Sequence, residues 1–250
     1  MTLTTHAGVF EGIGGFSLGA QRAGLQTTWV CEINPFRKQI LRTHFKHATQ
    51  YRDIRSLHNP ACIDILTGGF PCQNISVAGN GAGIVGRESR LWVEYYRIIC
   101  ECRPRYIIIE NSSQLRNKGL EIIFCDLSKI GYHAQWECLR AYEFGYPHAR
   151  ERLFIVAYAP EVGRRQIGHV PVFGEINEVL GRPYRPVILP VPIKRIHPHS
   201  NNSNIHGNYG LSRGLDRSAI AAIGDAVLVD IAEYIIKCIL LFENKIFGNG

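Results

Sequence analysis

The sequence predicts an α/β fold, with a doubly wound and mostly parallel sheet that carries a small irregular lobe. Up to about Ala159, short apolar runs alternate with helical patterns, which is typical of a parallel sheet flanked by helices. Seven of the twelve prolines then fall between Pro160 and Pro198, and proline at this density argues against long helices. We therefore expect the sheet in the first part of the chain and the lobe after it.

The expected strands are short apolar runs that end at glycines or polar residues. In a doubly wound sheet, ligands bind at the carboxyl ends of the strands. The loops that follow these runs are therefore the places where chemistry is expected. The runs lie near residues 8–10, 28–31, 63–66, 106–109, 135–138 and 153–158.

The expected helices combine capping residues with apolar side chains at helical spacing. Asn34 and Pro35 supply an N-cap and a first helical position after the second strand. A helix near the C-terminus is expected to pack back on the sheet. The apolar stripes are Leu91, Tyr95, Ile98 and Cys102; Leu120, Ile123, Phe124 and Leu127; and Leu228, Ile231, Ala232, Ile235, Ile239 and Phe242.

Charge is concentrated in the proline-rich part of the chain. The net charge is +7, and residues 160–217 carry eight Lys or Arg against four Asp or Glu. This asymmetry favours a nucleic acid as the partner of the lobe. The candidate contacts are Arg164, Arg165, Arg182, Arg185, Lys194 and Arg195.

Several classes of protein are disfavoured by composition. The eight cysteines lack the two-residue spacing of zinc or thioredoxin-like sites, so we expect reduced thiols and no metal site. Residues 1–8 carry no signal-peptide pattern, and the apolar run 239–242 is flanked by Lys237 and Glu243. We therefore expect a cytoplasmic protein that does not cross a membrane.

A glycine-rich turn follows the first expected strand. Gly12, Gly14 and Gly15 allow a tight turn and close approach of the backbone to a ligand. Glu32 ends the second strand twenty residues after Gly12, where a carboxylate can bind ribose hydroxyls. Ser17 stands at the sixth position of the dinucleotide fingerprint, which requires Gly or Ala. The turn therefore predicts a nucleotide-type ligand, and a purely structural turn is the alternative.

One cysteine stands apart from the other seven. Cys72 lies in the turn Pro71-Cys72-Gln73, directly after a strand that ends in glycines. A thiol in such a loop can be exposed, and its pKa can be tuned. We expect the other seven cysteines to be packing residues. Cys72 is therefore the candidate nucleophile.

Charged residues follow at two further points. Glu110 and Asn111 end the fourth strand, where an acid near a nucleophile is a better interpretation than a salt bridge or a helix cap. Arg150 and Arg152 precede the last strand. Residues two apart on an extended chain share a face, so both guanidinium groups can line one site. The alternative for the arginines is a solvated run of charge.

The order of these motifs resembles the C5-cytosine DNA methyltransferase family, from about Gly8 to Tyr234. The Pro71-Cys72-Gln73 turn resembles the nucleophile loop, Glu110-Asn111 matches the start of a Glu-Asn-Val motif, and Arg150 with Arg152 matches a Gln-x-Arg-x-Arg block. The resemblance implies a Rossmann-like fold of the S-adenosylmethionine-dependent methyltransferase type. It implies cofactor contacts from Phe10, Gly12, Gly14, Gly15, Glu32, Ile33, Asp53, Ile54, Pro71, Asp225 and Ala226, and DNA contacts from Gln73 and Ser76.

The resemblance also implies a mechanism. The Cys72 thiolate adds to C6 of a flipped-out cytosine, and C5 then takes the methyl group of S-adenosylmethionine, which leaves S-adenosylhomocysteine. Glu110 would bond to N3 and Arg152 would hold O2. Residues 1–159 would be the catalytic and cofactor-binding domain, residues 160–206 the target-recognition lobe, and residues 207–250 a segment that returns to the catalytic domain.

Four positions depart from the family pattern. Gly8 stands where Asp is usual, Ser112 replaces Val, His148 replaces Gln, and Asp225 replaces Asn. Asp225 cannot donate the hydrogen bond of an amide. These departures affect cofactor and loop contacts rather than the class of reaction.

The expected substrate is double-stranded DNA, methylated by a monomer in a bacterial or phage-infected cell. A restriction endonuclease acting independently would be its counterpart. A tRNA cytosine methyltransferase would use the same chemistry on RNA. A nicotinamide-dependent oxidoreductase is disfavoured by the interrupted glycine fingerprint. A DNA-binding homologue without activity is the third alternative, because of the four departures.

Overall fold

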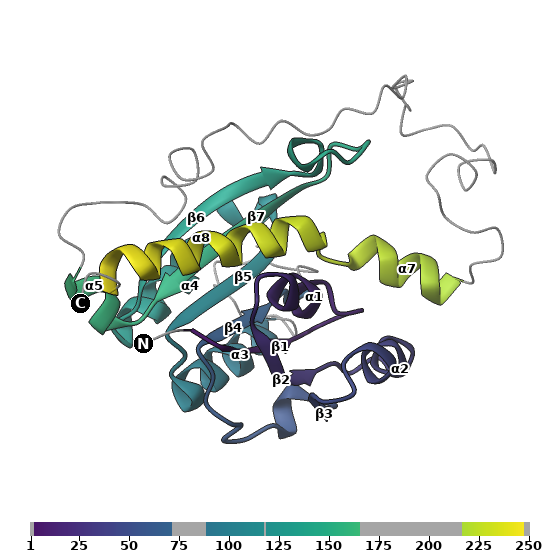
Figure 1. The fold of residues 1–250 in the computed structure, drawn as a ribbon, viewed down its shortest axis with the longest axis horizontal. Helices are drawn as coiled ribbons and strands as arrows, with labels where there is room; N and C mark the ends of the chain where they lie inside the picture. Colours follow the sequence, from purple (N-terminus) through teal and green to yellow (C-terminus); the bar gives the residue numbers. More distant parts are fainter. Residues whose placement is uncertain (1–2, 72–88, 118, 166–216, 248–250) are drawn as a thin grey trace, which may run out of the picture.

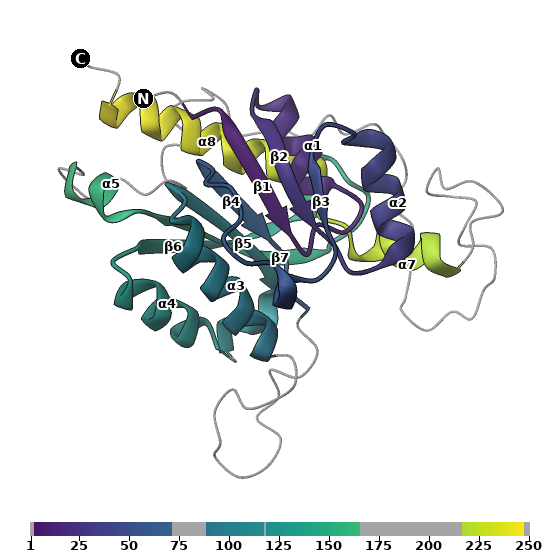
Figure 2. The ribbon, with the colours of Figure 1, turned by 90° about the horizontal axis from the view of Figure 1, so that it is seen from below.

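A computed structural model describes residues 3–71, 89–117, 119–165 and 217–247. Its centre is a seven-stranded sheet in the order β3-β2-β1-β4-β5-β7-β6, as Figures 1 and 2 show. The doubly wound sheet predicted from the sequence is confirmed. The strands are β1 Thr5–Val9, β2 Gln26–Cys31, β3 Thr49–Tyr51, β4 Ile65–Gly68, β5 Tyr106–Ser112, β6 His133–Arg140 and β7 Glu151–Tyr158.

Only one strand runs against the others. The strands β1 to β5 pair in parallel with their neighbours. In contrast, β7 is antiparallel both to β5 and to β6. The sheet is therefore mostly parallel, as expected, but the reversal of β7 was not predicted.

The sequence predicted six of the seven strands and missed one at the edge of the sheet. All six expected strands are present, with their ends moved by a few residues. The first ends at Val9 because Phe10 adopts a positive φ of 53°, which leaves the β region. The missed strand, β3, has the sequence Thr-Gln-Tyr and a burial pattern without a buried residue. Such a short polar edge strand has no apolar run to reveal it.

Helices cover both faces of the sheet (Figure 2). On β5, Ile107 and Ile109 enter one core while Tyr106 and Ile108 enter the other, because side chains alternate across a strand. The first core is closed by α3 and α4, and the second by α1 and α8. The helices are α1 Gly15–Arg22, α2 Pro35–His44, α3 Ser89–Cys102, α4 Leu120–Lys129, α5 Pro160–Arg165, α7 Arg217–Asp225 and α8 Val229–Phe247.

Two predicted helix features are confirmed in detail. The Asn34 side chain accepts hydrogen bonds from the backbone N–H groups of Phe36, at 3.0 Å, and Arg37, at 3.2 Å, so α2 begins at a capped Pro35. The C-terminal helix α8 packs against α1. A Cβ atom on Gly19 would lie 2.7 Å from the Cβ atom of Ala232, so glycine allows this close packing.

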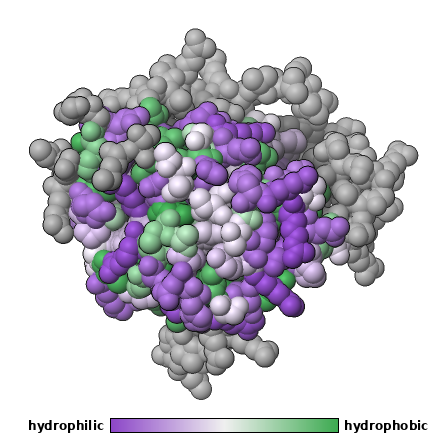
Figure 3. Space-filling view, turned by 60° about the horizontal axis from the view of Figure 1, so that its bottom comes forward, coloured by the Kyte–Doolittle hydropathy of each residue, from purple (hydrophilic) through white to green (hydrophobic). Residues whose placement is uncertain are grey.

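The surface in Figure 3 is a mixture of hydrophilic regions and small apolar patches. The exposed large apolar side chains are scattered over several elements rather than gathered in one. Within the part of the chain described, no helix has both the length and the apolar character needed to cross a bilayer. The same residues contain no group of three potential metal ligands among His, Cys, Asp and Glu.

Several predicted site residues lie outside the described residues. They are Cys72, Gln73 and Ser76 in the loop after β4, and Arg182, Arg185, Lys194 and Arg195 in the expected recognition lobe. The backbone of Arg164 and Arg165 belongs to α5. The assignment of all these residues to catalysis or DNA contact stays a prediction.

Candidate active site

The carboxyl edge of the sheet gathers the predicted site residues. Strand pairing places Val9 beside Gly68, and Gly68 beside Ile109. It also places Ser112 beside Arg152. The ends of β1, β4 and β5 therefore meet the beginning of β7 along this edge, as expected for the ligand site of a doubly wound sheet.

Glu110 and Arg152 form an ion pair at this edge. Glu110 is 8% exposed, and the Nε atom of Arg152 lies 3.0 Å from its Oε1 atom. Burial raises the pKa of the Glu110 carboxyl above its ordinary value, although the charges of Arg152 and Arg150 lower it. Glu110 therefore keeps a proton to a higher pH than an exposed glutamate would.

The antiparallel direction of β7 explains this pairing. Glu110 lies opposite Phe154, and Arg152 is two residues from Phe154 on the same face of the sheet. Because β7 starts at the edge where β5 ends, an arginine at its beginning reaches a glutamate at the end of β5. The two charged motifs, forty-two residues apart in the chain, meet through this one strand pair.

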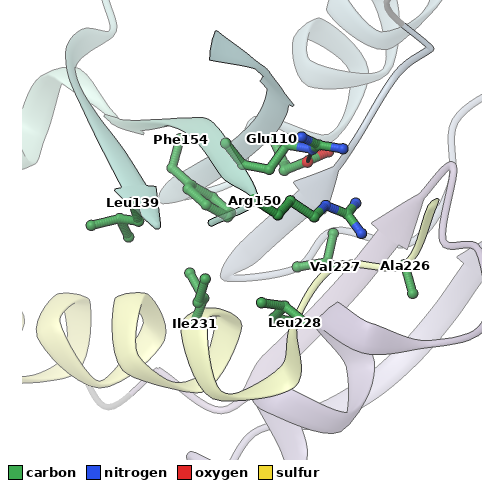
Figure 4. Close-up of a pocket in the computed structure, with 9 residues that line it drawn as sticks. Glu110, Leu139, Arg150, Phe154, Ala226, Val227, Leu228 and Ile231 are labelled. Carbon is green, nitrogen blue, oxygen red and sulfur yellow. Dashed lines mark ion pairs between the residues drawn. The ribbon is translucent and has the colours of Figure 1, made fainter. Parts of the chain in front are cut away.

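A pocket lies beside the ion pair, as Figure 4 shows. Glu110, Arg150 and Arg152 line one side of it, as the sequence predicted for the two arginines. The Nη1 atom of Arg150 donates a 2.6 Å hydrogen bond to the carbonyl oxygen of Gly224, which ties this side to the C-terminal part of the chain. The remaining lining is Leu139, Phe154, Ala226, Val227, Leu228 and Ile231.

The loop after β4 is anchored to the same edge. The Nδ2 atom of Asn111 donates a 3.0 Å hydrogen bond to the carbonyl oxygen of Phe70. A Cβ atom on Gly69 would lie 2.7 Å from Oε2 of Glu110, so glycine allows the loop to pass close to this carboxyl group. The described part of the loop ends at the exposed Pro71. The next residue, Cys72, therefore follows a backbone held beside Glu110.

The glycine turn occupies the β1 and β2 part of the edge. Gly12 and Gly14 have positive φ angles of 64° and 96°, which glycine adopts without strain. Within the described ranges, and leaving out its chain neighbours, no heavy atom lies within 4 Å of the place where a Cβ atom on Gly12 would be. Glu32 holds the turn: its Oε2 accepts from the N–H of Gly12 at 2.7 Å, and its Oε1 accepts from the N–H of Asn34 at 2.8 Å.

The other predicted cofactor residues differ in how accessible they are. Ile33 is 54% exposed beside this turn, whereas Ile54 is buried in the core, so a contact from Ile54 to a ligand would have to come from its backbone. Asp53 caps the short helix Ile54–Ser56 by accepting from the N–H of Arg55 at 3.0 Å. The Asp53 carboxyl also pairs with the Arg55 guanidinium at 2.6 Å.

The segment from Ile223 to Val227 returns to the glycine turn, but the Asp225 side chain points elsewhere. A Cβ atom on Gly15 would lie 2.4 Å from the carbonyl oxygen of Val227, so the two segments are in contact. Ala226 lines the pocket of Glu110. Asp225 instead forms a 2.5 Å ion pair with Arg37 of α2, and its side chain is largely exposed.

Comparison with known proteins agrees with this geometry. The family model described as C-5 cytosine-specific DNA methylase matches residues 5–179. This chain belongs to that family. The match includes the glycine turn, the segment after β4, the Glu110-Asn111 motif and the arginine pair of this chain.

Curated relatives are type II methyltransferases. M.CviJI of Paramecium bursaria Chlorella virus IL3A is 34% identical over 161 residues, which are 61% of this chain and 44% of that protein. M.NgoBI of Neisseria gonorrhoeae is 26% identical over 229 residues, or 87% of this chain and 64% of that protein. The chain thus spans about half the length of several curated relatives that it matches.

Solved structures agree on the fold. The Entamoeba histolytica methyltransferase EhMeth superposes with a TM-score of 0.60 at 14% identity, and covers 98% of this chain and 99% of that one. The S. pombe Dnmt2 methyltransferase has a TM-score of 0.54 at 20% identity, and covers 67% of this chain and 56% of that one. At these identities the likeness concerns the fold alone.

Two residues of this chain were given no role from the sequence. Asn111 belongs to a recognised motif, but its bond to Phe70 depends on the neighbouring strand. Glu11 lies inside the glycine turn and is 4% exposed. An acid directly before the first glycine of the turn, three residues after Gly8, was the sequence signal that could have found it.

The expectation for the other cysteines was partly wrong. Cys31, Cys102 and Cys238 are buried, as packing residues should be. Cys62 and Cys125 are exposed. An exposed cysteine in this chain is therefore not by itself a mark of the nucleophile, and the choice of Cys72 rests on its motif and on the anchored loop that precedes it.

Proposed function

We propose that this chain is a DNA (cytosine-5-)-methyltransferase that transfers a methyl group from S-adenosylmethionine to a flipped-out cytosine in duplex DNA. The observation that carries the proposal is the Glu110–Arg152 ion pair beside a loop that Asn111 ties to the same strand. The arginine holds the carboxyl group in place, while burial, which raises the pKa of Glu110, supports a protonated group next to a nucleophilic thiol. Membership in the C5-cytosine family supports the same reaction.

The residues of the glycine turn fit a nucleoside-type methyl donor. No described residue fills the space beside Gly12, and the Glu32 carboxylate lies directly at the turn. Each carboxylate oxygen has a second lone pair, so Glu32 can accept from a ribose hydroxyl while it still holds the turn. The exposed Ile33 offers an apolar surface beside it. When bound, S-adenosylmethionine supplies an electrophilic methyl group.

The chemistry assigned to the chain starts with Cys72. Its thiolate adds to C6 of the cytosine, and the electron pair of the C5–C6 bond becomes available for C5 to take the methyl group. A base then removes the C5 proton, the double bond forms again, and the thiolate leaves. A protonated Glu110 would donate a hydrogen bond to N3, and Arg152 would hold O2, so charge on the ring is offset during addition.

Bisulfite sequencing of plasmid DNA from cells that express the full chain tests this proposal. The wild type should protect cytosines in one recurring sequence context, and the variant Cys72→Ser should protect none. Identical patterns in the two cultures would contradict the function. A parallel assay on tRNA separates the RNA alternative, since that enzyme would methylate tRNA and leave the plasmid unmodified.

A further inference from the structure

The side chain of Glu11 lies against the backbone of Gly8. A Cβ atom on Gly8 would lie 1.7 Å from Oε2 of Glu11 and 2.7 Å from its Cδ. The carboxyl group of Glu11 therefore fills the space that a side chain at position 8 would need. Position 8 is also one of the four departures from the family pattern, where glycine stands in place of the usual aspartate.

The Glu11 carboxyl group is buried and only partly satisfied. Its Oε1 atom accepts a 2.9 Å hydrogen bond from the backbone N–H of Ser17 in the first turn of α1. Its Oε2 atom is buried and has no hydrogen-bond partner within the described part of the chain. The N-cap residue of α1 is Gly14, which makes no side-chain cap. Glu11 thus supplies the acceptor that this helix start lacks.

The backbone of Glu11 also shapes the turn. Its N–H donates to the carbonyl oxygen of Cys31 at 3.3 Å, and its carbonyl oxygen accepts from the N–H of Gly14 at 3.1 Å. One residue therefore links the second strand, the glycine turn and the first turn of α1. A shift of its side chain would move α1 relative to Gly12, where the methyl donor is proposed to bind.

We propose that Glu11 provides, from within the turn, the buried acid that position 8 lacks. Gly8 and Glu11 then form a compensating pair, and Glu11 is a positioning residue for the methyl donor. The identity of that ligand rests on the proposed function. A side chain at position 8 and the Glu11 carboxyl group cannot both occupy this place, because a Cβ atom on Gly8 would already lie 1.7 Å from Oε2 of Glu11.

A four-member cycle tests the pair: wild type, Glu11→Ala, Gly8→Asp and the double variant Gly8→Asp/Glu11→Ala. Binding of S-adenosylmethionine to the full chain is measured by calorimetry. Each single variant should bind at least about tenfold more weakly, since the buried hydrogen bond between Glu11 and the N–H of Ser17 is lost or displaced. The double variant should regain affinity to within about threefold of the wild type, because one acid again occupies the place.

Glu121→Ala is the matched control, since Glu121 is an exposed acid in the first turn of α4, away from the glycine turn. It should bind the methyl donor as the wild type does. If the double variant lost as much affinity for S-adenosylmethionine as the two single variants together, the compensating pair would be overturned. Normal binding by Glu11→Ala would overturn the positioning role.

The pH dependence of melting gives an independent readout of the buried acid. Burial raises the pKa of Glu11 to about 7, Ser17 lowers it by hydrogen bonding, and the charge of Glu32 raises it. Glu11 also faces the buried Tyr95 of α3 and lies near Thr67 of β4. The pKa of Glu11 is higher in the folded than in the unfolded chain. Its contribution to the free energy of unfolding is therefore present below pH 4.5 and lost as the pH rises through 7.

The melting temperature of the wild type should therefore fall relative to Glu11→Gln by roughly 5 °C or more between pH 5 and pH 8. A constant difference would show that Glu11 is not a buried titrating acid. If the wild type binds no S-adenosylmethionine, the proposed function and the positioning role both fail. In that case, non-additive melting temperatures of the four variants would still show that Gly8 and the Glu11 side chain compete for one place in the fold.

Discussion

The site has two halves that are held together in different ways. In the proposed cofactor half, formed by Phe10, Gly12 and Glu32, the carboxylate bonds to backbone N–H groups, and the turn depends on positive φ angles. In the base half, formed by Glu110, Arg150 and Arg152, charged side chains of different strands balance one another. The cofactor half is therefore shaped by the backbone, whereas the base half depends on long-range side-chain contacts.

This difference predicts that the halves can be impaired separately. A change in the base half should lower the rate of methyl transfer while cofactor affinity stays the same. A change in the cofactor half should lower cofactor affinity while the rate at saturating cofactor stays the same. Calorimetry with S-adenosylmethionine and single-turnover methylation of the target duplex measure the two quantities.

The largest effect is expected for Glu110→Ala. Loss of a donor that offsets charge in the transition state should lower methyl transfer by about 10²- to 10³-fold. Because burial raises the pKa of Glu110, the wild-type rate should fall with rising pH at a higher pH than the ionisation of an exposed glutamate would give, and Glu110→Gln should not show this fall. The measurements are single-turnover rates of both proteins across a pH series that starts in the acid range.

Glu137→Ala is the control for Glu110. Both glutamates lie opposite Phe154, Glu110 on β5 and Glu137 on β6, but Glu137 is exposed. Its removal should leave the rate unchanged. If Glu110→Ala and Glu137→Ala lowered the rate of methyl transfer equally, the loss would come from disturbed strand pairing and not from the base half.

A smaller effect, about tenfold to a hundredfold in methyl transfer, is expected for Arg152→Ala. The variant leaves the Glu110 carboxyl buried without its charged partner, and an unmade charged hydrogen bond costs about 1.5–3 kcal/mol. Arg140→Ala is the comparison, because Arg140 forms an exposed 2.7 Å ion pair with Glu151, and exposed pairs contribute little. Similar rates for both variants would contradict the role of Arg152.

The smallest effect, about tenfold in cofactor affinity, is expected for Glu32→Gln. Its side-chain NH₂ group cannot accept, so either Gly12 or Asn34 loses the acceptor for its N–H group. Glu101→Gln is the matched control, since Glu101 of α3 also accepts from a backbone N–H, that of Asn59, at 2.7 Å. A changed rate at saturating cofactor would show that the two halves are not separable.

Much of the fold follows from spacing along the chain. The apolar runs predicted six of the seven strands, and Asn34-Pro35 predicted the start of α2. Hydrophobic period and capping are local properties, so they are visible in the sequence. The polar edge strand β3 was missed because its position depends on pairing with β2 and not on its own residues.

The sequence by itself determined the residue types of the site: the glycine turn, Glu32, Glu110 and the arginine pair. Only the tertiary structure decided which of them meet. Had β7 run parallel to β5 from the same edge, Arg152 would lie beside Ile107, about 10 Å along the strand from Glu110. Likewise, only the folded chain brings the carboxyl group of Glu11 over Gly8. The direction of a strand and the contact of a turn with a helix are set by long-range packing, which local spacing does not encode.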